Sequence, residues 1–147
     1  MSIFEDTAPR AVRHEPLRVA VLGASGSVGV QTLDVCRHFP QKVEVAALAV
    51  RSSVEFAVKA ATEFNCKYVA FADASVKGNA LLDSLPQGCK SSFGPEAVQA
   101  LAELDEVDCV VNAVVGEAGI YAGLAAVKAG KVLAYANKES IVVGGDL

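Results

Sequence analysis

The segment Arg18–Gly29 most constrains this chain, because an apolar run of strand length leads into glycines spaced three residues apart and then into a helical pattern. Gly23 would let the chain turn tightly off the strand, and Gly29 would let the new helix pack closely on the sheet. Gly26 would omit a Cβ where a pyrophosphate approaches the backbone. Unpaired N–H groups at the start of the helix would then face that negative charge.

Glycine turns at strand–helix junctions also occur without a ligand, so the motif has two interpretations. In the first, the hydroxyl groups of Ser25 and Ser27 add donors for phosphate, and a dinucleotide binds at the turn. In the second, the glycines serve only turning and packing. The position of the motif on the first strand of a βαβ series favours the dinucleotide.

Apolar runs of strand length alternate with helical patterns along the rest of the chain. This alternation predicts an α/β fold: a Rossmann-like, doubly wound, mostly parallel sheet with helices on both faces. The near-continuous apolar composition of several runs indicates strands that helices cover on both faces. The expected strands are 18–23, 43–50, 67–72, 88–92, 108–114 and 131–136, and the expected helices are 27–38, 54–65, 75–85, 95–104 and 117–129.

Length and composition favour one domain, because 147 residues, 52% of them hydrophobic, suffice for one core. Residues 1–16 are expected to form a flexible leader and 17–147 the dinucleotide-binding domain. An apolar segment at 141–147 has nothing after it to pack against, which suggests the front part of a longer chain. A net charge of -4 with scattered basic residues disfavours nucleic acid as a partner. No run of about twenty apolar residues supports a membrane span.

The four cysteines lack the spacing of a CxxC motif or of a metal site. They lie mostly in apolar segments, where a free cysteine behaves as a small hydrophobic residue. We therefore expect reduced, structural thiols and a cytoplasmic location, with a disulfide or a metal site as alternatives. These cysteines are Cys36, Cys66, Cys89 and Cys109.

The residues after the second expected strand indicate which dinucleotide binds. In NAD sites a carboxylate near this position accepts from the ribose 2′-OH, whereas an arginine accommodates the 2′-phosphate of NADP. Here Arg51, Ser52 and Ser53 follow the strand, and no acidic residue is present at its tip. The planar donors of Arg51 suit phosphate, so NADPH is favoured over NADH. In the alternative interpretation, Arg51 is merely solvated and Ser53 caps the next helix.

Other polar residues are less specific. Asn112, inside an apolar strand, is expected to be a buried amide bonded to nearby backbone rather than a cofactor contact. The segment 137–140 follows the last strand, where ligands bind in open α/β sheets, but it could equally be a helix cap. His14 and His38 are expected at the surface, and the acidic residues within 103–108 are expected to keep a loop solvated. Neither a catalytic residue nor a metal ligand is assigned in this chain.

Several motifs taken together resemble the 1-deoxy-D-xylulose 5-phosphate reductoisomerase family. The likeness runs from about residue 17 to the end in the order of the family, and the Ala-Asn-Lys-Glu-Ser segment is its most specific part. The motifs are GASGSVG at 23–29, QTLDV at 31–35, VVGEAG at 114–119 and ANKES at 136–140.

The resemblance implies an NADPH-dependent enzyme of non-mevalonate isoprenoid biosynthesis. Such an enzyme rearranges 1-deoxy-D-xylulose 5-phosphate and reduces the product to 2-C-methyl-D-erythritol 4-phosphate, with Mg²⁺ or Mn²⁺ holding the substrate oxygens. The metal ligands, the substrate-phosphate site and the lid would follow residue 147, so this chain alone would bind cofactor without turnover. The whole enzyme would be a homodimer that takes a phosphorylated sugar as substrate.

The resemblance also implies roles for individual residues. Arg51 stands where many family members have Gly or Ala, although its charge suits NADP. By position, Ser25, Gly26, Ser27 and Val28 would bind the pyrophosphate region, Arg51, Ser52 and Ser53 the adenosine phosphate end, Asn137 and Glu139 the nicotinamide side, and Lys138 the substrate.

Two other functions fit the same glycine turn. One is the NADP-binding domain of a semialdehyde dehydrogenase, a group that shares a strand followed by Gly-Ala-Ser/Thr-Gly and needs a nucleophilic cysteine in a later domain. The other is a non-catalytic module that binds NADP(H) and signals through a partner. The residues that follow position 147 in the parent chain would separate the first from a reductoisomerase, and cofactor titration with candidate partners would test the second.

Overall fold

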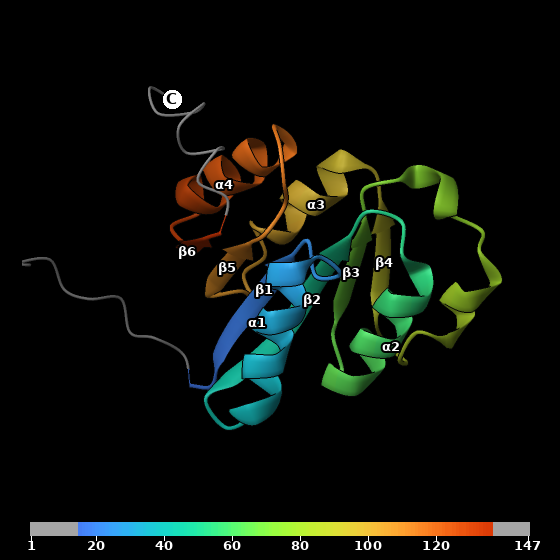
Figure 1. The fold of residues 1–147 in the computed structure, drawn as a ribbon, viewed down its shortest axis with the longest axis horizontal. Coiled ribbons are helices and arrows are strands. Elements are labelled where there is room, and N and C mark those ends of the chain that lie inside the picture. Colours follow the sequence, from blue (N-terminus) through green and yellow to red (C-terminus); the bar gives the residue numbers. More distant parts are fainter. Residues whose placement is uncertain (1–14, 137–147) are drawn as a thin grey trace, which may run out of the picture.

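A computed structural model describes residues 15–136, within which six strands form one parallel sheet in the order β4-β3-β2-β1-β5-β6 (Figure 1). All but the last two residues of the expected leader lie outside that range. The strands are β1 (Leu17–Leu22), β2 (Val43–Val50), β3 (Tyr68–Phe71), β4 (Lys90–Phe93), β5 (Cys109–Asn112) and β6 (Val132–Tyr135); the helices are α1 (Ser27–His38), α2 (Val54–Phe64), α3 (Pro95–Leu101) and α4 (Ala118–Lys128).

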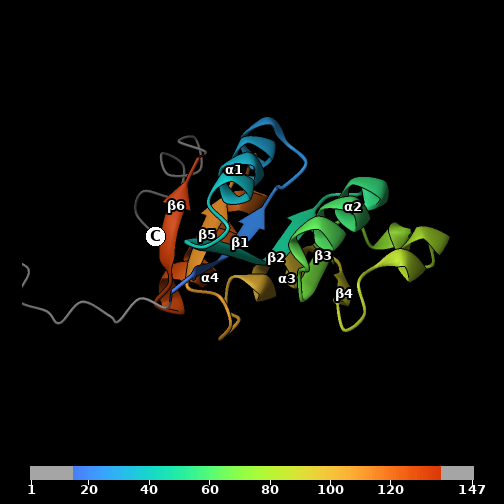
Figure 2. The ribbon, with the colours of Figure 1, turned by 90° about the horizontal axis from the view of Figure 1, so that it is seen from below.

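The strand order confirms the doubly wound prediction. The chain moves outward from β1 to β4, then returns to the other side of β1 and adds β5 and β6, with every strand pair parallel. Helices α1 and α2 cover one face of the sheet, while α3 and α4 cover the other (Figure 2). The order reverses between β1 and β5, which is where open α/β sheets bind ligands. None of the helices within 15–136 is long and apolar enough to cross a bilayer.

The two faces of the sheet are packed with side chains of different size. The face under α1 and α2 carries larger residues such as Leu48 and Phe71, whereas the face under α3 and α4 is mostly alanine. One alanine is an insertion: Val19 pairs with Val45 but Ala20 pairs with Ala47, so the β1–β2 register shifts at Ala46. Ala46 and Ala47 therefore both pack on the α3–α4 face, and the two-residue alternation of β2 is interrupted.

The expected helix at 75–85 is wrong. The structure has two short 3-10 helices there, Ala74–Val76 and Ala80–Ser84. Gly78, with φ +103°, breaks the helical path between them. The side chain of Asn79 then accepts a hydrogen bond from the Leu81 N–H at 2.9 Å and starts the second helix. Side-chain capping of this kind competes with a continuous helix.

Acidic residues at the amino ends of the strands form hydrogen bonds between segments that are distant in the sequence. The Asp108 carboxylate accepts hydrogen bonds from the backbone N–H, Nε and Nη2 of Arg18 at 2.8–3.0 Å, which joins β1 to the start of β5. The hydroxyl of Tyr68 donates to Glu106 at 3.2 Å. The expectation that this acidic stretch only keeps a loop solvated is therefore wrong for Asp108 and Glu106.

All four cysteines are free, as expected. Cys36, Cys66 and Cys109 belong to the core under α1 and α2, and Cys89 packs against it. Burial raises the pKa of Cys66 to about 12 and raises the pKa of Cys36 and Cys89 as well. These side chains therefore stay protonated and act as small hydrophobic residues.

Replacing Gly29 by Ala is expected to lower the free energy of unfolding by about 3 kcal/mol, because the added Cβ would lie 2.2 Å from the Gly23 carbonyl oxygen and 2.6 Å from the Ala24 Cα. Both atoms are backbone, so neither can rotate away. Urea unfolding followed by circular dichroism measures the change. Gly26→Ala is the matched control and should lower the free energy of unfolding by no more than about 1 kcal/mol. Equal losses in the two variants would contradict the close approach of Gly29 to the Gly23–Ala24 backbone.

Candidate cofactor site

The turn after β1 is held by both neighbouring strands. The N–H groups of Gly23 and Ala24 both donate to the Ala49 carbonyl of β2, at 3.0 and 2.9 Å. On the other side, a Cβ on Gly23 would lie 2.7 Å from the carbonyl oxygen of Ala113, just after β5. With φ +78°, Gly23 also adopts a conformation that side chains disfavour. This turn therefore lies between β2 and β5, where the strand order reverses.

Gly26 differs from the other two glycines of the motif. Its φ of -76° and ψ of 172° are accessible to any residue. A Cβ there would meet only the Gly23 carbonyl oxygen, at an ordinary 3.5 Å. Folding therefore needs glycine at Gly23 and Gly29 but not at Gly26. Close packing therefore does not account for glycine at position 26, which is exposed to solvent.

The start of α1 presents unpaired donors beside Gly26. The helix begins at Ser27, no side chain among residues 15–136 caps it, and its first turn contains no acidic residue. Gly26 accepts from the N–H of Val30, at 2.9 Å, so the N–H groups of Ser27 and Val28 precede the first intrahelical bond. Ser25, Ser27 and Val28 are all exposed. The positive end of the helix dipole thus faces an open surface that suits an anion.

The end of β2 places a cation at the same edge of the sheet. Arg51, Ser52 and Ser53 are all exposed. Ser53 occupies the N-cap position of α2, but its hydroxyl makes no capping hydrogen bond. The alternative in which Ser53 caps the helix is therefore correct for the position of the residue but not for its side chain. Because Leu22 pairs with Ala49, the ends of β1 and β2 are adjacent.

Asn112 is structural, as expected. It is fully buried, donates from Nδ2 to the Gly119 carbonyl at 2.7 Å, and accepts from the Val114 N–H at 3.3 Å. The hydroxyl of Tyr135 donates to the same Gly119 carbonyl at 2.6 Å. A Cβ on Gly123 would lie 2.7 Å from the ring of Tyr135, so α4 and β6 pack closely. Tyr135 was not predicted from the sequence, although the small residues Gly119 and Gly123, four apart on α4, signal a close contact there.

The predicted nicotinamide and substrate residues, Asn137, Glu139 and Lys138, lie outside the described residues. The backbone that leads to them is placed: the N–H of Ala136 donates to the Asn112 carbonyl at 3.1 Å. The chain therefore leaves β6 at the same edge of the sheet as the glycine turn.

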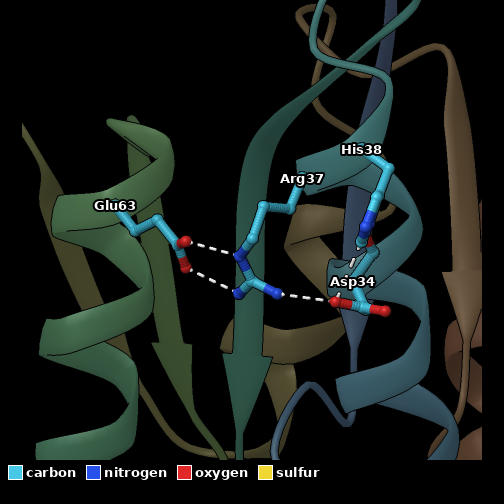
Figure 3. Close-up of polar contacts among 4 residues, drawn as sticks. All are labelled: Asp34, Arg37, His38 and Glu63. Carbon is cyan, nitrogen blue, oxygen red and sulfur yellow. Dashed lines mark hydrogen bonds and ion pairs between the residues drawn. The ribbon is translucent and has the colours of Figure 1, made fainter.

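The opposite end of α1 carries an ion-pair network that belongs to the scaffold (Figure 3). Arg37 donates to both carboxylate oxygens of Glu63 on α2, at 2.6 and 2.8 Å, and to Asp34 at 3.0 Å. The hydrogen bonds from Arg37 lower the pKa of the Glu63 carboxyl group. His38 is exposed, as expected, and its Nδ1 contacts the Asp34 carbonyl. A cavity of about 510 Å³ lies beside this network, remote from the glycine turn.

The described residues do not suit a metal ion. Within 15–136 the structure has no group of three or more His, Cys, Asp or Glu residues that could hold one.

Comparisons with known proteins agree with this geometry. The family model for 1-deoxy-D-xylulose 5-phosphate reductoisomerase matches residues 19–145. The enzyme of that name from Photorhabdus laumondii is 42% identical over 131 residues, which is 87% of this chain and 33% of that protein.

Solved structures give the same result. The reductoisomerase of Zymomonas mobilis in complex with NADPH matches with a TM-score of 0.82 at 36% identity, over 88% of this chain and 34% of that one. A reductoisomerase in complex with NADPH, fosmidomycin and magnesium matches with a TM-score of 0.80 at 35% identity, over 89% of this chain and 32% of that one. The chain thus spans about a third of the length of these relatives. It belongs to the 1-deoxy-D-xylulose 5-phosphate reductoisomerase family.

Proposed function

We propose that residues 17–147 form the NADPH-binding domain of a 1-deoxy-D-xylulose 5-phosphate reductoisomerase. Gly26 carries this proposal, because its bare Cα is exposed, unstrained and not required by packing. A ligand that must approach the backbone explains a glycine at such a position. Two of the relatives that match over most of this chain were solved with NADPH, which agrees with that explanation.

Each part of the open edge would hold one part of the cofactor. The N–H groups of the first turn of α1 and the hydroxyls of Ser25 and Ser27 would bind the pyrophosphate, with Val28 against it. Arg51 would pair with the 2′-phosphate, assisted by the hydroxyls of Ser52 and Ser53. The exposed side chains of these residues are consistent with those contacts.

The segment after β6 would complete the site. Asn137 and Glu139 would lie on the nicotinamide side, and Lys138 would face the phosphorylated sugar substrate. Bound NADPH supplies the hydride that reduces the rearranged sugar phosphate to 2-C-methyl-D-erythritol 4-phosphate. The described residues bind and orient the cofactor, and such positioning is a large part of the catalysis of hydride transfer.

The whole protein is further proposed to work in the cytoplasm as a metal-dependent homodimer of non-mevalonate isoprenoid biosynthesis. A relative solved with magnesium supports the divalent metal. The four free thiols agree with a reducing compartment. The homodimer rests on the resemblance to the family.

Gly26→Ala is expected to weaken NADPH binding at least tenfold, because the new methyl group would occupy the space through which the pyrophosphate reaches the N–H groups of α1. Isothermal titration of the 147-residue chain measures the dissociation constant. Unfolding in urea, run in parallel, should show a loss of no more than about 1 kcal/mol in the free energy of unfolding, so that the variant is folded under the titration conditions. An unchanged affinity in the folded variant would contradict the proposed pyrophosphate site.

Arg51→Gln is expected to weaken NADPH binding about tenfold to a hundredfold, the range for losing a charge-assisted contact. The affinity for NADH should change less than twofold, since NADH lacks the 2′-phosphate. Arg37→Gln is the matched control, because it removes an arginine at the far end of α1 and should leave both affinities unchanged. Equal losses of affinity for NADPH and NADH in Arg51→Gln would show that Arg51 does not bind the 2′-phosphate.

A further inference from the structure

Asp73 lies beside the proposed 2′-phosphate site. It follows β3, whose carboxyl end is adjacent to that of β2, and its N–H donates to the Arg51 carbonyl at 2.9 Å. The preceding residue, Ala72, donates in the same way to Val50 at 3.0 Å. The backbone of Asp73 is thus tied to the residue that carries the proposed phosphate-binding cation.

The carboxylate of Asp73 is held in one position. Its Oδ1 accepts from the Ser75 N–H at 2.9 Å, at the start of the 3-10 helix Ala74–Val76, and the residue is half-buried. The hydrogen bonds from Ser75 lower the pKa of Asp73, and the positive charge of Arg51 lowers it further. The side chain is therefore ionised at neutral pH, with a fixed location.

The charges of Asp73 and Arg51 interact without a direct contact. The ion pairs found among residues 15–136 do not join these two side chains. Arg51 itself is exposed to solvent. An anion that reaches Arg51 would therefore also feel the negative charge of Asp73.

We propose that Asp73 is a specificity-determining residue that limits the preference of this chain for NADPH over NADH. The inference rests on the proposed function. A 2′-phosphate carries close to two negative charges, so Asp73 repels it while Arg51 attracts it. The neutral 2′-OH of NADH is almost insensitive to either charge. Asp73 therefore weakens NADPH binding selectively.

The test is Asp73→Asn, which removes the charge and keeps a side-chain oxygen for the Ser75 N–H. The dissociation constant for NADPH is expected to fall about threefold to tenfold in low salt, the range for like charges that interact through a solvated site without touching. That for NADH should change less than twofold. The gain should shrink in 0.5 M NaCl, because salt screens the repulsion. Asp83→Asn, an equal charge change at an exposed position of Ala80–Ser84, is the control.

Three outcomes would overturn the inference: unchanged or weaker NADPH binding in Asp73→Asn, an equal change for both cofactors, or an equal gain in Asp83→Asn. An equal change would mean that Asp73 acts on the local fold and not on the 2′-phosphate. Titration of the wild-type chain with NADPH and NADH tests the proposed function separately. If the wild-type chain binds neither cofactor, the NADPH proposal fails, and this inference fails with it.

Discussion

The close approach of α1 to the end of β1 is the contact on which the rest of the molecule depends. The Cα of Gly29 lies so near the Gly23–Ala24 backbone that not even a methyl group fits between them. This approach aims the first turn of α1 at the point where the strand order reverses. Two hydrogen bonds to Ala49 fix the same turn to β2. The helix end that would meet the pyrophosphate is therefore positioned by backbone packing and not by a flexible loop.

The amino ends and the carboxyl ends of the strands differ in how their charged groups are used. At the amino ends of the strands, charged groups pair with one another: Arg18 with Asp108, and Arg37 with Glu63. At the carboxyl ends, Arg51 and the start of α1 are exposed and form no ion pair with another residue of 15–136, and the carboxylate of Asp73 is held nearby. Side chains that stabilise the fold are thus separated from side chains that are available to a ligand.

Most of the fold was predictable because its signals are local. The strand runs, Pro95 at the start of α3 and Gly130 after α4 each depend on residues close in sequence. The wrong prediction of one helix over 75–85 has a local explanation as well, because Gly78 separates two short 3-10 helices there. The insertion at Ala46 was not predictable, because it depends on the register between β1 and β2.

The sequence alone was enough to indicate the parallel α/β fold, the position of the glycine turn and the arginine beside it, since spacing and residue type carry that information. It did not reveal which glycines the fold requires, that Asp108 binds Arg18, or that Asp73 lies next to Arg51. Those relations join residues on different strands. They arise only when β1 takes its place between β2 and β5, and β3 takes its place beside β2.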